Sequence, residues 1–418
     1  MKKSVSIIIF QIAVLLFAGN LYCQDINYPK EILNNLASRN MCGRGYVKSG
    51  DAKAAAYISS ELDKLDMLSF DKSYFQEYSF AMNTFPKNMK VILDKNELHP
   101  VYDYVVAPDC KTIKGEFKIK YLPSAADTND AIYDSIIKID YSGYFVVADF
   151  PNRKIARNNP LKASGVIVPK DKIHWWVSTG HTVSEVPVIV ISASLMKLKP
   201  HKISVDIKNK FIKNYKTQNI IAYIKGAQTP DSFLVFTAHY DHLGMMGYGN
   251  IFCGANDNAS GSAMLLWLAK YFSLHRADLK YSAVFMFFSG EETGLLGSKY
   301  YIEHPLFPLS QIKYLINLDM VGTGSEGISI VNGKKNSEIS NAMIEINKKH
   351  NCFTDIKLRD ESCNSDHCFF DKAGVPAIFI FTRGSEFAEY HNLDDVPEDL
   401  PLTKFSELKN LLIEFVKQ

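Results

Sequence analysis

The chain has 418 residues, of which 47% are hydrophobic and 22% are charged. This composition is typical of a globular protein with a large core and excludes disorder as its main character. The 47 basic and 45 acidic residues leave a formal net charge of only +2. Such a balance gives no global attraction to nucleic acid or to an anionic membrane surface, so partners have to be inferred from individual sites.

Residues 1–23 are predicted to be a signal peptide. Lys2 and Lys3 precede an apolar run from Val5 to Phe17, and AGNLYCQD follows, which is the layout of an export signal. The run is shorter than the ~20 residues that a spanning helix needs, so no transmembrane segment is predicted. We expect cleavage after Cys23 and an exported protein, periplasmic or extracellular. A lipid anchor on Cys23 is the alternative, disfavoured by the bulky Tyr22 before it.

Cysteine usage gives no disulfide pattern. The chain contains seven cysteines at irregular spacings, and a protein of this length does not need bridges to fold. An oxidising compartment permits bridges, but no connectivity follows from the sequence.

Residues 24–100 are predicted to form the first part of the main domain. Pro29 to Ser38 and Asp51 to Leu65 show helix-like apolar spacing, and Asp51 is placed to cap the second helix. The glycine-rich loop MCGRGY between them contains Arg44, for which we expect a structural or rim position.

Residues 101–200 have the sequence pattern of an inserted, small β-rich domain. Short β-like runs such as YFVVADF, SGVIVP and VPVIVIS are separated by Pro, Asn, Asp and Gly, and no chemically suggestive cluster accompanies them. The adjacent Trp175 and Trp176 are the one unusual feature. Packing is the favoured interpretation of such a pair, and a ligand platform is the alternative.

Residues 201–418 alternate between strands and helices. Apolar runs such as NIIAYIKG, SFLVFTAHYD, SAVFMFFSGEE, IKYLINLDMVG and VPAIFIFT are separated by helical segments such as SGSAMLLWLAKYF and NSEISNAMIEINKK, and the chain ends in the amphipathic KFSELKNLLIEFVK. Continuous apolar strands separated by helices predict an α/β fold with a mainly parallel, mixed sheet covered by helices on both faces.

Polar residues gather where these predicted strands end. His239, the pair Glu291 and Glu292, and Asp319 each follow a strand, and the last strand runs into the loop that carries His391. Asp257 lies in GANDNASG, just before a helix. Ligands of open α/β sheets bind beyond the carboxyl ends of the strands, so these positions favour one shared site.

Each of these residues also has an ordinary structural explanation. Asp257 could cap a helix, the two glutamates could favour a helix N-terminus, and a lone histidine is more often a core residue than a ligand. These explanations do not account for the convergence of histidines and carboxylates at one edge of a sheet, where burial and mutual repulsion disfavour them unless cations are present.

Two metal ions would resolve that conflict. Imidazole and carboxylate ligands without thiolates suit catalytic zinc, and two ions about 3.5–4 Å apart need a bridging carboxylate, for which Asp257 is placed. Asp241 could accept the ring N–H of His239 and fix its tautomer. Because adjacent side chains point in different directions, one of Glu291 and Glu292 can bind metal while the other acts as a base.

The order of these motifs resembles the co-catalytic di-zinc aminopeptidase family, which includes bacterial leucyl aminopeptidases, aminopeptidase Y and glutamate carboxypeptidase. The motifs are HYDHLG, GANDNASG, FSGEETGLLGS, NLDMVG, SDHCFF and YHNLDD, and the resemblance covers most of the chain after the leader. Residues 101–200 look like the protease-associated domain that many members insert, with the implied role of a rim or lid, between the two parts, 24–100 and 201–418, of a zinc-exopeptidase fold.

The resemblance also implies roles for individual residues. His239 and Asp319 would bind one zinc ion, Glu292 and His391 the other, and Asp257 would bridge the two ions. Glu291 would be the general base toward a water that bridges the metals, and Asp241 the orienting partner of His239. The implied activity is zinc-dependent hydrolysis of N-terminal residues from peptides with a free N-terminus.

The chain departs from the family at the oxyanion donor. Some relatives have a tyrosine just before Ser-Asp-His, where this chain has Cys363 and Asn364, so Tyr390 is only a candidate for that role. Three alternatives stay open. They are a single-zinc glutaminyl cyclase, disfavoured by Tyr390 and the NASG turn; carboxypeptidase or dipeptidase action; and a receptor-like binding module, disfavoured by the complete ligand set.

Overall fold

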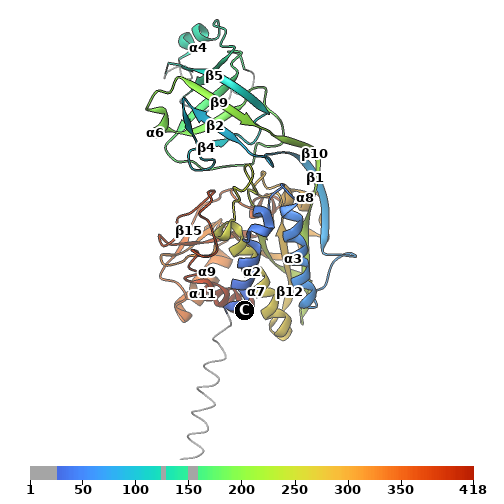
Figure 1. Ribbon diagram of the computed structural model, residues 1–418. Helices are drawn as coiled ribbons and strands as arrows, with labels where there is room; N and C mark the ends of the chain where they lie inside the picture. Colours follow the sequence, from blue (N-terminus) through green and yellow to red (C-terminus); the bar gives the residue numbers. More distant parts are fainter. Residues whose placement is uncertain (1–25, 124–128, 149–158) are drawn as a thin grey trace, which may run out of the picture.

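The computed structural model describes residues 26–123, 129–148 and 159–418. The predicted signal peptide and Cys23 lie outside the described residues, as does part of the predicted strand YFVVADF. The described chain forms two units, one above the other in Figure 1. Two long antiparallel strands, β1 (Phe75–Thr84) and β10 (Lys210–Ile224), run from the lower, main unit to the upper, second unit.

The main unit contains an eight-stranded mixed sheet in the order β1-β10-β12-β11-β13-β16-β14-β15. Its four central strands are parallel to one another, and β10 and β14 run antiparallel to their central neighbours. The remaining strands are β11 (Thr229–His239), β12 (Tyr281–Phe288), β13 (Ile312–Leu318), β14 (Gly327–Val331), β15 (Ile356–Leu358) and β16 (Ala377–Arg383). The predicted mainly parallel sheet is confirmed; β1, β14 and β15, which lack long apolar runs, were not predicted.

Helices cover both faces of this sheet, as predicted, because the central strands are apolar on both sides. In β11, Leu234 and Phe236 pack on one face, and Phe233 and Val235 on the other, which follows from the two-residue period of a strand. The first face carries α2 (Asn27–Leu36), α3 (Gly50–Lys64), α7 (Gly261–Leu274), α9 (Ser337–His350) and α11 (Phe405–Val416). The second carries α8 (Leu296–Glu303) and α10 (His367–Lys372).

The predicted cap at Asp51 is wrong. The N-cap position of α3 is Ser49, without a side-chain cap, and Asp51 lies inside the first turn. Its buried carboxylate instead accepts hydrogen bonds from the hydroxyls of Tyr215, at 2.5 Å, and Thr217, at 2.8 Å. Asp51 therefore ties α3 to β10, a long-range contact that local sequence cannot reveal.

The second unit contains a separate eight-stranded sheet in the order β3-β2-β9-β5-β6-β7-β8-β4. Its strands are β2 (Lys90–Leu93), β3 (Asn96–Glu97), β4 (Tyr104–Val106), β5 (Ile113–Tyr121), β6 (Tyr144–Val147), β7 (Gly165–Lys170), β8 (Val188–Ser192) and β9 (Lys202–Ile207), with the short helices α4 (Asp130–Ile136) and α6 (Ala193–Met196). The sheet extends past the predicted limits of 101 and 200 because β2 and β9 pair with each other. Its assignment as a protease-associated domain stays a prediction.

The two units share an apolar cluster. Tyr46, Met246 and Phe252 of the main unit pack in the same buried cluster as Val106 and Trp175 of the second unit. In the part of the chain that the structure describes, no helix has the length and apolar character needed to cross a membrane.

Candidate metal centre

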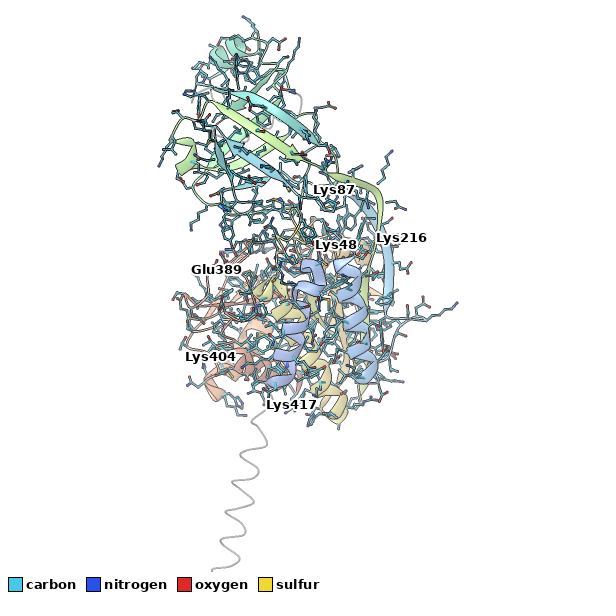
Figure 2. The ribbon with its side chains drawn as sticks, in the orientation of Figure 1. Lys48, Lys87, Lys216, Glu389, Lys404 and Lys417 are labelled. Atoms are coloured by element: carbon cyan, nitrogen blue, oxygen red, sulfur yellow. A yellow bond between two sulfur atoms is a disulfide. The ribbon has the colours of Figure 1, made fainter. Side chains whose placement is uncertain are left out.

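The predicted site residues meet beyond the carboxyl ends of the central strands. A cavity of about 400 Å³ lies there. It is lined by the six residues that were predicted from the strand ends and from the turn before α7, namely His239, Asp257, Glu291, Glu292, Asp319 and His391. The loop that carries His391 lies at the end of the main unit that faces the second unit, where Glu389 is labelled in Figure 2. The strand ends therefore bring together residues that are up to 152 positions apart in the sequence.

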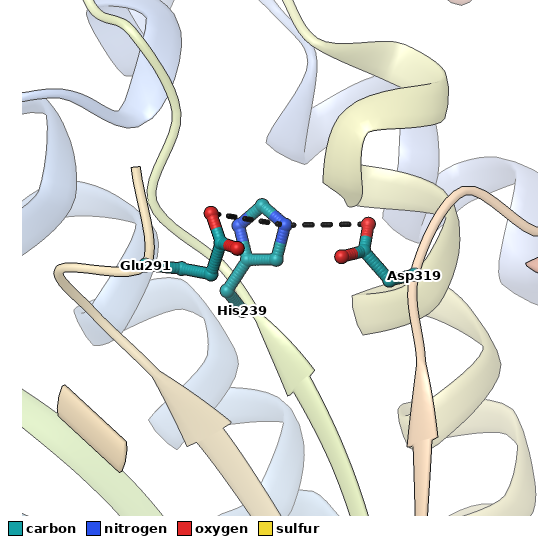
Figure 3. Close-up of side chains that lie close together, drawn as sticks. All are labelled: His239, Glu291 and Asp319. Carbon is teal, nitrogen blue, oxygen red and sulfur yellow. Dashed lines mark ion pairs between the residues drawn. The ribbon is translucent and has the colours of Figure 1, made fainter. Parts of the chain in front are cut away.

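One set of ligand atoms surrounds Nε2 of His239. This nitrogen lies 3.3 Å from Oδ1 of Asp257 and 3.4 Å from Oδ1 of Asp319. Oε2 of Glu291 is more distant, at 4.0 Å. Figure 3 shows Glu291 and Asp319 approaching His239 from opposite sides.

A second set surrounds Nε2 of His391. This nitrogen lies 3.1 Å from Oδ2 of Asp257 and 3.4 Å from Oε2 of Glu292. Asp257 therefore presents a different carboxylate oxygen to each histidine. The peptide bond between Asp257 and Asn258 is cis.

The spacing within both sets suits tetrahedral zinc. Zinc–nitrogen and zinc–oxygen bonds of about 2.0–2.1 Å place two ligand atoms of a tetrahedron about 3.3 Å apart. The four ligand-to-ligand distances run from 3.1 to 3.4 Å. In each set, the distances from the histidine nitrogen to its two carboxylates are thus those expected between ligands of a tetrahedral zinc ion.

Both histidines direct their second ring nitrogen to a main-chain carbonyl. Nδ1 of His239 lies 3.1 Å from the carbonyl oxygen of Asp241, and Nδ1 of His391 lies 3.0 Å from that of Trp175. Because Nδ1 is engaged as a donor, the neutral form of each ring carries its lone pair on Nε2, the nitrogen that faces the carboxylates. Each ring is therefore held in the tautomer and direction that metal binding requires.

Buried charges perturb the pKa values in the site. Burial disfavours a charged His391, but Glu292 and Asp257 raise its pKa to about 11. Burial likewise disfavours a charged Glu292, yet the charge of His391 and the hydrogen bonds from His242 and His391 lower its pKa to about 2. Asp257 follows the same pattern: its pKa lies well below its usual value despite burial because His239 and His391 donate hydrogen bonds to it. The cluster thus offsets its carboxylates with positive charge, a role that bound dications would fill.

Glu291 differs electrostatically from its neighbour. Burial, with added repulsion from Glu292 and Asp319, raises the pKa of Glu291 well above its usual value, although His239 opposes this effect. A carboxylate with a raised pKa in a cavity is suited to accept and return a proton near neutral pH.

Asp241 contacts its neighbours differently from the prediction. Its main-chain carbonyl, not its carboxylate, accepts the hydrogen bond from His239, since Oδ1 lies 3.8 Å from Nδ1. The buried carboxylate instead accepts the hydroxyl of Tyr46, at 2.6 Å, and the main-chain N–H of Glu291, at 3.2 Å. Asp241 therefore fixes the backbone that carries Glu291 as well as the ring of His239.

Sequence reasoning missed two side chains that hold the proposed ligands. Nδ1 of His242 lies 2.7 Å from Oε1 of Glu292, closer than two ligands of one tetrahedral ion, so His242 suits the role of orienting Glu292. The hydroxyl of Ser365 donates to Oδ2 of Asp319 at 2.7 Å. Both residues lie within the quoted motifs HYDH and SDH, and only their contacts distinguish their roles.

The turn that carries Asp257 is held from two sides. The carboxylate of Asp395 accepts the main-chain N–H groups of Asn256 and Asp257, at 2.8 and 3.1 Å. On the other side Arg44 is fully buried, contrary to a rim position. Its guanidinium donates to the carbonyl oxygens of Leu36, Tyr240, Cys253, Gly254 and Asp257.

Aromatic and apolar residues form the rest of the cavity wall. Tyr390 stacks on His391 with ring centroids 3.9 Å apart, and Trp176 of the second unit meets the same ring edge-on at 4.4 Å. Leu295, Met320, Phe379 and Phe381 also line the cavity. Cys363, another lining residue, forms a disulfide with Cys368, a pairing that the cysteine spacing did not predict.

Comparison with known proteins finds similarity to one peptidase family over the C-terminal part of the chain. Residues 219–416 match the family model described as Peptidase family M28. Aminopeptidase YwaD of Bacillus subtilis is 28% identical over 221 residues, which cover 51% of this chain and 46% of the relative. A probable leucine aminopeptidase of Arthroderma otae is 28% identical over 223 residues, covering 50% of this chain and 58% of that protein. The matches thus span about half the length of these relatives.

Solved structures share the fold over both units. A zinc aminopeptidase from Bacillus subtilis superposes with a TM-score of 0.68 at 19% identity, covering 93% of each chain. A peptidase M28 precursor from Shewanella amazonensis gives a TM-score of 0.67 at 16% identity, covering 98% of this chain and 96% of the other. The arrangement of a main unit with a second β-rich unit is therefore common to these proteins.

Proposed function

Because residues 219–416 match the model of peptidase family M28, we propose that this chain belongs to that family and is a di-zinc aminopeptidase that removes single residues from the N-termini of peptides. The observation that carries the proposal is the position of Asp257, whose two oxygens face two separate ligand sets at tetrahedral spacing. The relatives named as aminopeptidases support the same activity. The leader sequence supports export.

Each ligand set would hold one zinc ion. His239, Asp257 and Asp319 would bind the first ion, and Asp257, Glu292 and His391 the second. When bound, the two ions would polarise the scissile carbonyl and lower the pKa of a water molecule. About two zinc ions per chain are expected in metal analysis, whereas one ion per chain would favour cyclase chemistry.

The proposed proton path depends on Glu291. Its carboxylate lines the cavity but lies outside both sets of tetrahedral contacts, so it is free to take the proton of the attacking water and to pass it to the leaving amine. Tyr390 also lines the cavity, and its hydroxyl is the proposed hydrogen-bond donor to the developing oxyanion. Asp241 holds Glu291 in place through the Glu291 main-chain N–H.

The charge of the site favours a substrate with a free α-amine. Asp257, Glu291, Glu292 and Asp319 supply four negative charges, which balance two dications, and moving a water proton to Glu291 does not change that sum. The cavity therefore has no net positive charge that would repel a substrate ammonium, and its carboxylates can accept hydrogen bonds from it. The apolar lining residues Leu295, Met320, Phe379 and Phe381 favour an apolar N-terminal side chain.

The proposal is tested with leucine anilide and its N-acetylated form, measured side by side on the zinc-loaded protein. Acetylation removes a charged contact worth about 1.5–3 kcal/mol, so kcat/KM should fall by roughly ten- to hundredfold or more. Equal rates on the two substrates would contradict aminopeptidase action and favour a carboxypeptidase-like or endopeptidase-like activity.

A further inference from the structure

The segment from His174 to Ser178 belongs to the second unit by sequence but lies against the metal centre. It follows β7 and precedes β8 of the second sheet. Within it Trp175 and Val177 are buried, whereas Trp176 is 51% exposed. Two adjacent tryptophans therefore occupy opposite environments, which packing alone does not explain for Trp176.

The main chain of Trp175 holds His391 by two hydrogen bonds. The N–H of Trp175 donates to the carbonyl oxygen of His391 at 3.2 Å, and Nδ1 of His391 donates to the carbonyl oxygen of Trp175 at 3.0 Å. His391 also has a positive φ of 51°, which is uncommon for a residue other than glycine. The contact thus fixes both the backbone and the ring of a residue whose local conformation is unfavourable.

The side chain of Trp175 fixes that main chain in turn. Its indole N–H donates to the carbonyl oxygen of Val106 in the second unit at 2.9 Å, and its ring stacks on Phe252 of the main unit with centroids 5.1 Å apart. The indole is therefore anchored to both units at once. Any shift of the second unit would move the carbonyl that orients His391.

Trp176 points to the other side, into the cavity. Its ring contacts His391 edge-on at 4.4 Å and lies 5.8 Å from the ring of Tyr390. Among the described residues that line the cavity, it is the largest exposed apolar side chain. A peptide held at the metal centre would contact this indole and bury part of it.

We infer that the segment His174–Ser178 forms part of the active site. In it Trp175 is a positioning residue for His391, and Trp176 is a contact for apolar peptide substrates. The positioning role of Trp175 concerns metal binding by the second ligand set. The substrate contact of Trp176 rests on the proposed function. Coupling between sites is reciprocal. Binding of the second zinc ion and packing of the second unit against the main unit should therefore favour each other.

Adjacent substitutions separate the two roles. Trp175→Ala should weaken binding of the second zinc ion by roughly ten- to hundredfold, the scale for loss of a group that orients a metal ligand, while the first ion stays bound. Trp175→Phe keeps the ring that stacks on Phe252 but loses the hydrogen bond to Val106, and should restore only part of this affinity. Trp176→Ala should bind both ions as the wild type does but raise KM for leucine anilide by roughly tenfold. Zinc affinity is measured by chelator competition at a temperature where circular dichroism shows each variant folded.

Hydrogen exchange of the wild-type protein gives a test that does not depend on the folding of any variant. Zinc should slow exchange in the peptide that contains residues 174–178, because the N–H of Trp175 donates to His391. The slowing should be larger there than in β5, which lies in the second sheet away from this contact.

The outcomes separate this inference from the proposed function. Wild-type zinc affinity in Trp175→Ala, or zinc-independent exchange in 174–178, would overturn the positioning role. Unchanged KM or lost zinc in Trp176→Ala would overturn the substrate contact. If the wild type binds two zinc ions, shows the exchange effect and cleaves no peptide anilide, the aminopeptidase proposal and the substrate contact fail, while the positioning role stands.

Discussion

At the residue scale, the adjacent glutamates should respond oppositely to the same substitution. Glu291→Gln should keep both zinc ions and lower kcat by roughly 10²–10⁴, because a proton acceptor is lost but no ligand is. Glu292→Gln should lose metal from the second ligand set, since its Oε2 faces His391. Metal analysis and steady-state kinetics on both variants check this assignment, and exchanged phenotypes would show that the two roles are reversed.

Tyr390 allows a second test of a single side chain. Tyr390→Phe keeps the ring that stacks on His391 and removes only the hydroxyl. Loss of one oxyanion donor should lower kcat by roughly 10²-fold with little change in KM or in zinc content. An unchanged kcat would exclude the Tyr390 hydroxyl from that role.

The same scale shows where sequence reasoning stops. Five of the six cavity residues were predicted because each stands at a strand end or before a helix, and His391 because it lies in the loop after the last strand, which are local patterns. His242 and Ser365 stood in the same motifs, but their roles depend on contacts with Glu292 and Asp319 that only the folded chain defines. Trp176 was interpreted as packing because its sequence neighbourhood carries no sign of the distant His391.

At the element scale, Arg44 should stabilise the turn that carries Asp257. It lies in the 3-10 segment Arg39–Arg44, and Arg44→Lys would leave most of its five buried carbonyls without a donor, at about 1–3 kcal/mol each. We expect a clear loss of thermal stability together with weaker zinc binding. Arg39→Lys is the matched control, because Arg39 belongs to the same element and makes one exposed hydrogen bond, to Gly249. Equal effects of the two substitutions would contradict this role.

The packing of α11 on α7 predicts a pH dependence. Lys409 of α11 is 1% exposed and lies over the Trp267 ring of α7, and burial lowers its pKa from 10.5 to about 7. Between about pH 7 and 10.5 the unfolded chain binds a proton at this lysine that the folded chain does not, so stability rises with pH across that window. Below pH 7 Lys409 is protonated in both the folded and the unfolded state. The cost of burying its charge then lowers the free energy of unfolding by its full amount.

Lys409→Met removes this penalty and keeps contact with the ring. The variant should therefore melt at a higher temperature than the wild type at pH 6.5, and the difference should shrink by pH 9.5. Thermal denaturation at the two pH values checks the prediction, and a difference that does not change with pH would contradict it.

At the scale of the whole molecule, the sequence predicted the central sheet better than the second unit. Parallel strands buried on both faces are continuous apolar runs, so β11, β12, β13 and β16 could be identified one by one. The limits of the second unit could not, because β2 and β9 are short and are defined by pairing with each other across more than a hundred residues. The contact between Trp175 and His391 likewise depends on how the two units meet.

Metal removal should lower the stability of the entire chain. The proposed ligands come from four strand ends and the turn before α7, so two bound ions would tie together the ends of the central sheet, and the His391 loop contacts the second unit through Trp175. Zinc at a thousandfold excess over Kd would add about 4 kcal/mol per site to the free energy of unfolding, provided that the unfolded chain binds none. Chelation should therefore lower Tm, and zinc should restore it.

Asp257→Ala makes this test specific to the shared ligand. Among the described residues, its carboxylate is the one group that faces both His239 and His391, and without it two dications would repel each other with no negative charge between them. The variant should bind neither ion tightly, and its Tm should respond to neither chelator nor zinc. Glu292→Gln, by contrast, should keep the first ion and about half of the zinc-dependent rise in Tm. Retention of one tightly bound ion by Asp257→Ala would show that the two ligand sets are independent and that Asp257 is not a bridge.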